Sequence, residues 1–167
     1  MNLSDLRDHL RQKADDIQQY LEGDAKEIVG QTAVDHYRKS FDNEGYTDEL
    51  LNPWQEVERR KPESPWYGHS GETGRYSPER TRAPILTGET GELKEAIRYA
   101  PIPGGVRVSN EKPYAHIHNY GGPAKVYGKT PFVMPRRQFM GPSKALTRRL
   151  KERITRDLTH ILKSSSN

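Results

Sequence analysis

The sequence predicts an α+β fold, in which helices at both ends of the chain flank a small, mostly antiparallel sheet and a long irregular loop. Three observations lead to this prediction. Apolar residues recur at helical spacing near both ends of the sequence. Alternating apolar and polar residues flank a proline–glycine turn in the second half. Between these regions lies a stretch that is rich in proline and glycine and has little periodicity.

Two helices are expected in the helical part, residues 1–41. The first, over residues 3–21, has Ser4 or Asp5 as a suitable cap. Its apolar stripe consists of Leu3, Leu6, Leu10, Ile17 and Leu21. Gly23 and Asp24 then mark a stop and a restart, and a second stripe follows from Ala25 to Phe41. Because both stripes are wide, the two helices need a further layer to cover them.

A long irregular loop is expected over residues 42–87. Residues 43–88 contain five prolines and five glycines, and no period of 2 or 3.6 is evident. A loop of this length in a compact domain is usually functional or disordered. The aromatic residues Trp54, Trp66 and Tyr67 indicate that parts of it dock onto the domain.

The sheet and its connecting loops are expected over residues 88–142. A short helix is predicted from Gly91 to Ile97, capped by Thr87 or Thr90. The segments "AIRYAPI" and "GVRVSN" alternate around Pro103, Gly104 and Gly105, which predicts a β-hairpin. Residues 114–120 alternate in the same way and predict another short strand.

The last expected element is a helix over residues 143–163, with Ser143 as its cap. Its apolar residues are four apart and predict a narrow buried stripe: Leu146, Leu150, Ile154, Leu158 and Leu162. All these elements are expected to form a single domain, residues 1–167, because the length suits one core.

The composition predicts a thin core. Hydrophobic residues make up 32% of the chain and charged residues 30%, and the mean hydropathy is -1.01. Such a chain gains stability from partners that cover the apolar surface that it cannot bury alone. The absence of cysteine excludes disulfides, thiolate metal sites and a cysteine nucleophile. No apolar run approaches the roughly 20 residues of a membrane span, so we expect synthesis in the cytoplasm and no membrane partner.

No catalytic or metal site is expected. His116 and His118 are two apart, so on a strand both could face one metal, with His69 as a further ligand. The strong zinc spacings are absent, however, and the histidines are better explained as polar residues of a sheet face or a subunit contact. Nucleophile-elbow and phosphate-binding motifs are absent too. We therefore expect no enzyme activity and no cofactor.

Basic residues offer an alternative function. The net charge is +4 and the sequence pI is about 9.2, and basic residues are frequent from Arg136 to Arg156. A nucleic-acid-binding accessory protein would need them on one face. On the predicted last helix the arginines lie all around instead, and Glu152 and Asp157 interrupt them. A solvated helix face is the simpler interpretation.

The stretch "TPFVMPRRQFMGPS", residues 130–143, is the strongest candidate for a contact surface. Pro131 and Pro135 hold it extended and remove hydrogen-bond donors, which excludes a central strand. A stiff segment presents apolar side chains at low entropic cost, and arginine adds forked donors. We therefore predict a subunit interface that includes Phe132, Arg136, Arg137 and Phe139. The alternative is a loop packed on its own domain.

The order of several motifs resembles the phage virion morphogenesis family, the tail-completion or neck proteins of Mu-like and related tailed phages. A phenylalanine and a tryptophan come first (Phe41, Trp54), followed by the leucine-threonine-glycine turn at residues 86–88. A tyrosine-alanine step then leads to His118 and paired glycines, and a proline-arginine element precedes the last helix. The matching residues in these two motifs are Tyr114, Ala115, Gly121, Gly122, Pro135, Arg136, Arg137, Phe139 and Gly141.

The resemblance covers about residues 25–160; the loop from Lys61 to Arg82 is longer than the family pattern. It implies a non-enzymatic virion protein that joins or completes the tail at the head–tail junction. Such proteins typically form homo-oligomeric rings, often hexamers, and contact the connector and the tail-tube or tail-terminator proteins. Non-specific contact with passing DNA is also implied. Tyr114 and Trp54 join the predicted interface because they belong to the matching motifs.

Overall fold

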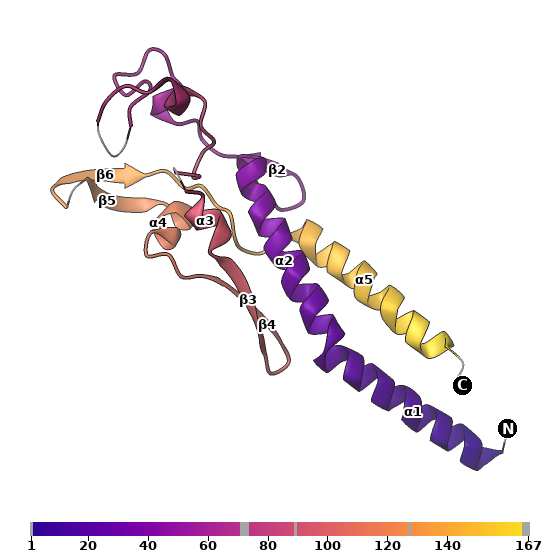
Figure 1. Ribbon diagram of the computed structural model, residues 1–167. Helices are drawn as coiled ribbons and strands as arrows, with labels where there is room; N and C mark the ends of the chain where they lie inside the picture. Colours follow the sequence, from indigo (N-terminus) through magenta and orange to yellow (C-terminus); the bar gives the residue numbers. More distant parts are fainter. Residues whose placement is uncertain (1, 71–73, 89, 127, 165–167) are drawn as a thin grey trace.

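A computed structural model describes residues 2–70, 74–88, 90–126 and 128–164. It confirms the α+β class. The molecule is elongated: a helical arm occupies one end, and the hairpins and loops gather at the other (Figure 1). The helices are α1 (Leu3–Glu22), α2 (Asp24–Asp42), α3 (Glu92–Glu95), α4 (Ala115–Tyr120) and α5 (Lys144–Lys163), and two 3-10 turns cover Glu58–Arg60 and Pro78–Thr81.

Within the described residues, three separate two-stranded antiparallel sheets take the place of the single small sheet expected from the sequence. They pair β1 (Gly45–Thr47) with β2 (Leu51–Pro53), β3 (Ile97–Ile102) with β4 (Gly105–Asn110), and β5 (Gly122–Val126) with β6 (Thr130–Met134). The β3–β4 hairpin lies where the sequence predicted it. The β1–β2 hairpin and the two 3-10 turns interrupt the predicted loop of residues 42–87.

One expectation for residues 114–134 was wrong. Residues 115–120 form helix α4 and not a strand, and its buried residues Ala115 and Asn119 are one helical turn apart. Residues 130–134 pair with residues 122–126 as a hairpin. Two prolines fit in this hairpin because a two-stranded sheet has free edges where a missing donor costs little.

The helix caps differ in part from those expected. Asn2 caps α1 and forms a capping box with Asp5, whereas Ser4 lies inside the helix. Helix α3 starts after Gly91, whose φ is 68°, and no threonine side chain caps it. At α5, the Ser143 hydroxyl accepts from the Leu146 backbone N–H (3.1 Å), as predicted.

The core gathers where the C-terminal half of α2 meets the hairpins and the long loop. Its buried members are Val34, Phe41, Trp54, Ile85, Leu93, Ile97, Ala115 and Phe139. Helix α2 also packs on β3 through Gly30, where an added Cβ would lie 2.1 Å from the Tyr99 ring. The core is small, as the composition predicted.

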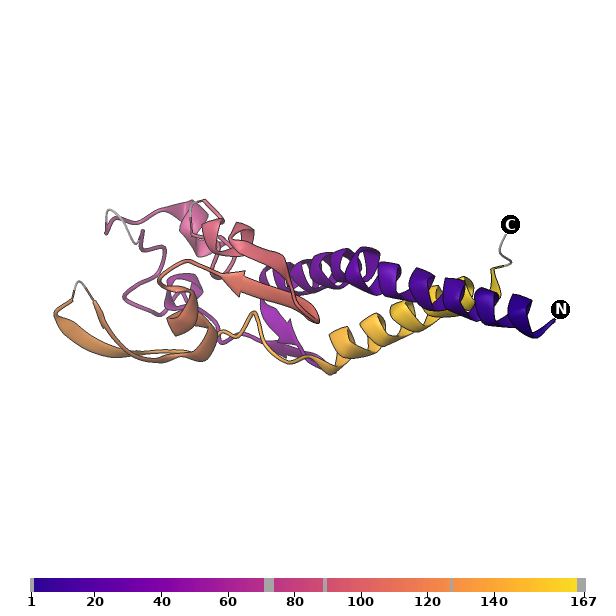
Figure 2. The same ribbon diagram turned by 90° about the horizontal axis from the view of Figure 1, so that it is seen from below.

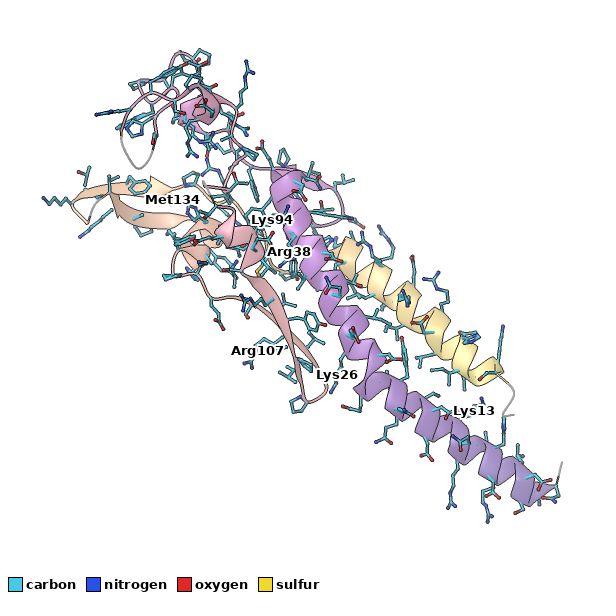
Figure 3. The ribbon with its side chains drawn as sticks, in the orientation of Figure 1. Lys13, Lys26, Arg38, Lys94, Arg107 and Met134 are labelled. Atoms are coloured by element: carbon cyan, nitrogen blue, oxygen red, sulfur yellow. The ribbon has the colours of Figure 1, made fainter. Side chains whose placement is uncertain are left out.

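Polar contacts connect α1 to α5 within the helical arm. Figure 2 shows α1 and α2 following one another with α5 alongside. The buried Lys13 Nζ donates to the carbonyls of Ile161 (2.9 Å) and Ser164 (2.6 Å) at the end of α5. Lys13 is labelled in Figure 3. The Tyr20 hydroxyl donates to Asp157 (2.8 Å), and burial together with this carboxylate raises the tyrosine pKa to about 12.

The predicted leucine stripes are therefore covered less than expected. Leu3, Leu6, Leu10 and Leu21 on α1 are exposed. On α5 Leu146 is buried, Leu150, Ile154 and Leu158 are half-buried, and Leu162 is exposed. The arm consequently carries apolar surface that no described part of this chain covers.

Candidate interaction site

The proline–arginine segment, residues 135–143, runs from β6 to the start of α5 and is called the strap below. It passes beside the C-terminal half of α2. Phe139 is 1% exposed, and its ring centroid lies 5.2 Å from that of Phe41. Trp54 packs edge-on against the other side of Phe41, with centroids 5.6 Å apart. The strap is thus inserted into the core through one aromatic anchor.

Side chains from several elements satisfy the strap's backbone carbonyls. The Trp54 indole donates to Gln138 O (2.7 Å). The Tyr37 and Tyr46 hydroxyls both donate to Gly141 O (2.8 and 2.6 Å), and the Ser40 hydroxyl approaches Phe139 O (3.4 Å). These bonds replace the ladder that a strand would supply, because a buried backbone group left unpaired is costly.

Asn119 of α4 fixes the middle of the strap. Its Oδ1 accepts from the backbone N–H groups of Phe139 (2.8 Å) and Met140 (2.9 Å), and its Nδ2 donates to Met140 O (3.1 Å). The α4–β5 turn brings the chain close to the strap at Gly121, which has φ 71°. A Cβ there would lie 2.8 Å from Arg136 N, so a larger residue would displace the strap.

The two arginines of the strap have different environments. Arg137 is buried, and its Nε and Nη2 donate to Gln55 O (3.2 and 3.1 Å). Burial lowers the pKa of its guanidinium, whereas Glu56 favours the charged form. Arg136 is exposed and hydrogen-bonds to the Gln138 side chain. Arg137 is therefore a structural group, and Arg136 is the one available to a partner.

A polar hollow of about 510 Å³ lies beside the strap and has Arg136 in its lining. Its wall includes Tyr46, Asp48, Asn52, Trp54 and Gln138. Asp48 also accepts from the Lys144 backbone N–H (2.7 Å) at the start of α5. The hollow thus lies between the β1–β2 hairpin and the strap, and its lining carries both signs of charge, Asp48 and Arg136.

The six predicted interface residues fall into two groups. Trp54, Arg137 and Phe139 are buried within their own subunit, so the alternative of a segment packed on its own domain describes them. Tyr114, Phe132 and Arg136 are exposed. Phe132 belongs to the β5–β6 hairpin, which protrudes from the rest of the molecule (Figure 1). Val126 and Val133 of the same hairpin are exposed as well. An interface role stays a prediction for this exposed group.

The two histidines do not form a metal site. Residues two apart on a helix point about 200° apart, so the geometry expected for a strand is lost on α4. The His116 ring lies 4.8 Å from the Tyr120 ring, and the His118 ring lies 6.1 Å from the Tyr114 ring. Burial and the neighbouring Arg137 lower the pKa of His118. Within the described ranges, no group of three or more His, Asp or Glu side chains is placed to hold a metal.

Sequence reasoning missed the residues that fix the loops. Glu44 has φ 48°, and its carboxylate accepts from Arg60 (2.8 and 2.5 Å) and from the Ile85 backbone N–H (2.8 Å). The Arg60 hydrogen bond is the main reason that the Glu44 pKa is lowered. Arg59 and Arg60 bind backbone carbonyls at residues 80, 83 and 84. Among the residues that hold the loops and the strap, only Asn119 could have been found from the sequence, because its spacing of four from Ala115 is typical of one face of a helix.

The fold and this surface define a small α+β protein whose polar side chains mainly hold its own loops in place. Residues 55–159, which include the strap and most of α5, match the phage virion morphogenesis family. The chain belongs to that family. Neither the curated proteins nor the solved structures yielded a match. Among the residues described, no helix has both the length and the apolar character to cross a bilayer.

Proposed function

We propose that this chain is a structural subunit of the phage head–tail junction that completes or joins the tail as part of a homo-oligomeric ring. Its membership of the phage virion morphogenesis family carries the proposal. The connector and the tail-tube or tail-terminator proteins are the proposed partners. The protein would be made in the host cytoplasm and become part of the virion.

The distribution of polar groups supports a non-catalytic role. Tyr37, Tyr46, Trp54 and Asn119 all use their polar atoms on backbone groups of the strap. These side chains hold the shape of the strap. The exposed apolar side chains of the β5–β6 hairpin and of α1 suit a subunit that is completed by its neighbours.

Virion assembly tests the proposal directly. A phage whose copy of this gene is interrupted should accumulate filled heads and separate tails, visible by negative-stain electron microscopy. Supplying the full chain from a plasmid should restore joined particles, and an antibody should label the head–tail junction. Joined, infectious particles formed without the protein would rule the proposed function out.

A nucleic-acid-binding accessory protein remains the second candidate, and the placement of α5 favours it more than the sequence did. Four apolar residues of α5, from Leu146 to Leu158, are buried or half-buried. The seven basic residues of this helix are all exposed: Lys144, Arg148, Arg149, Lys151, Arg153, Arg156 and Lys163. The acidic residues on this helix are Glu152 and Asp157. A salt titration decides the matter: DNA binding that persists near physiological salt favours this candidate, and negligible binding at low salt removes it.

A further inference from the structure

Two apolar patches remain uncovered at opposite ends of the helical arm. The first is a shallow hollow of about 480 Å³ near the start of α1, called the α1 groove below. It is lined by Leu3, Leu6, Arg7, Leu10, Arg11 and Ala14. Leu3 is 86% exposed, Leu6 42% and Leu10 60%. Three neighbouring leucines in water are unusual on a helix that has a partner alongside.

The position of α5 explains why the α1 groove is open. Lys13 and Tyr20 point toward α5, and Lys13 binds the carbonyls at the end of that helix. The first turns of α1 extend past this point, as Figure 1 shows at the N-terminal end of the arm. Leu3, Leu6 and Leu10 therefore lie beyond the reach of α5.

The second patch is the turn between β1 and β2, called the β1–β2 tip below. Leu50 is 79% exposed and Leu51 47%, and Glu49 beside them is exposed as well. The tip is held in shape, because the Asn52 side chain donates to Leu50 O (3.1 Å) and Asp48 binds the Lys144 backbone N–H (2.7 Å). Two leucines are thus presented on a preorganised turn, which lowers the entropic cost of docking.

The charges of the two patches are complementary. Arg7 and Arg11 line the α1 groove, whereas Glu49 accompanies the leucines of the tip. Arg11 has no ion pair or hydrogen bond within the described part of the chain, and Arg7 is engaged locally with Ser4 and Asp8. Glu49 makes an exposed contact of 3.4 Å to Lys144, which is weak enough to be exchanged for a partner arginine.

The two patches of one chain cannot meet. In Figure 1 the β1–β2 hairpin lies at the C-terminal end of α2, and the first turns of α1, which line the α1 groove, lie at the far end of the arm. We propose that the β1–β2 tip of one copy docks into the α1 groove of the next copy. The proposal rests on the proposed function as a repeating subunit. Different surfaces meet in such a contact, so it is heterologous and can propagate around a closed ring.

Cysteine cross-linking tests this contact cleanly, because the chain has no cysteine of its own. Leu10→Cys protein mixed with Leu50→Cys protein should form a disulfide-linked heterodimer under mild oxidation, and the double variant should form a ladder of covalent multimers. Leu10→Cys with Lys129→Cys, at the turn of the β5–β6 hairpin, is the matched control and should give little product. Absence of the heterodimer would overturn the proposal, as would equal cross-linking of Leu10→Cys with itself.

A charge exchange tests the specificity of the contact. Arg11→Glu or Glu49→Arg alone should weaken self-association, measured by sedimentation velocity, by roughly tenfold or more, since like charges would then meet. Combining both changes in one chain should restore most of the self-association. If neither single change affects self-association, the α1 groove serves another partner and the proposal is wrong. Protein found at the junction of virions without the Leu10–Leu50 cross-link would leave the proposed function standing while this contact fails.

Discussion

Asn119 and Met140 are joined by both polar ends of the asparagine side chain, which accepts from Met140 N (2.9 Å) and donates to Met140 O (3.1 Å). The same oxygen accepts from Phe139 N (2.8 Å). One buried amide therefore satisfies three backbone groups of the strap at once. The position requires a donor and an acceptor side by side, and among side chains of this size only asparagine supplies both.

Replacing Asn119 with alanine should destabilise the fold strongly. The backbone N–H groups of Phe139 and Met140 would lose their partner inside the protein, and Met140 O would keep only the bond from the Gln138 side chain (3.3 Å). We expect the free energy of unfolding to fall by about 2–4 kcal/mol. Urea denaturation followed by tryptophan fluorescence measures this, because Trp54 packs nearby. His116→Ala on the same helix is the control, since His116 is exposed. Equal effects of the two changes would contradict the structural role of Asn119.

Substitution of Arg136 and of Arg137 should affect the stability of the fold to different degrees. Arg137→Met should lower the free energy of unfolding by about 1–3 kcal/mol, because Gln55 O would lose its donors inside the protein. Arg136→Met should change it by less than about 0.5 kcal/mol, since the side chain is exposed. If Arg136 contacts a partner, its variant should stay folded but assemble poorly. Similar losses of stability would refute the distinction.

Gly30 should not tolerate a side chain while Tyr99 is present. Alanine usually favours a helix over glycine by about 1 kcal/mol, but here its Cβ would meet the Tyr99 ring. We expect Gly30→Ala to destabilise the protein by about 1–3 kcal/mol. In a Tyr99→Leu background the same change should be neutral or stabilising. A double-mutant cycle by thermal unfolding measures the coupling, and strict additivity would show that the two residues do not clash.

Acid should destabilise the fold through His36. Burial lowers its pKa from 6.5, while its Nε2 lies 3.1 Å from Thr47 O. Below the ordinary pKa the unfolded chain binds the proton first, so stability is complete above about pH 6.5 and is lost as the pH falls toward the lowered value. His36→Gln should reduce this dependence, whereas His160→Gln on the exposed face of α5 should not. Unfolding curves at several pH values test it; identical slopes in the wild type and His36→Gln would refute it.

The three long helices and one hairpin could be predicted because their signals are local. Ser143 caps α5 as its sequence context indicates, and the turn at Pro103 and Gly104 sets the β3–β4 hairpin, whose register pairs Ile102 with Gly105. These features depend on neighbouring residues alone. The predicted ends of the three long helices accordingly lie within one or two residues of the observed ends.

The remaining structure depends on contacts between distant residues. Alternation over residues 114–120 indicated a strand, but a helix places Asn119 against the strap and buries Ala115. The strap was interpreted as an exposed interface because its prolines and arginines are typical of one. Its carbonyl partners come from residues up to 104 positions away, as in the bond from Tyr37 to Gly141. No local pattern reveals such a pairing.

The attachment of the strap through its carbonyls has a consequence for how this region can vary. Trp54, Tyr37 and Tyr46 bind main-chain oxygens of the strap, which every amino acid carries. The exposed side chain of Arg136 takes no part in these bonds, so related proteins can change it, and with it the surface offered to a partner, while the segment stays attached in the same place. Backbone atoms of the strap thereby preserve its shape, while exposed side-chain atoms can change with the partner.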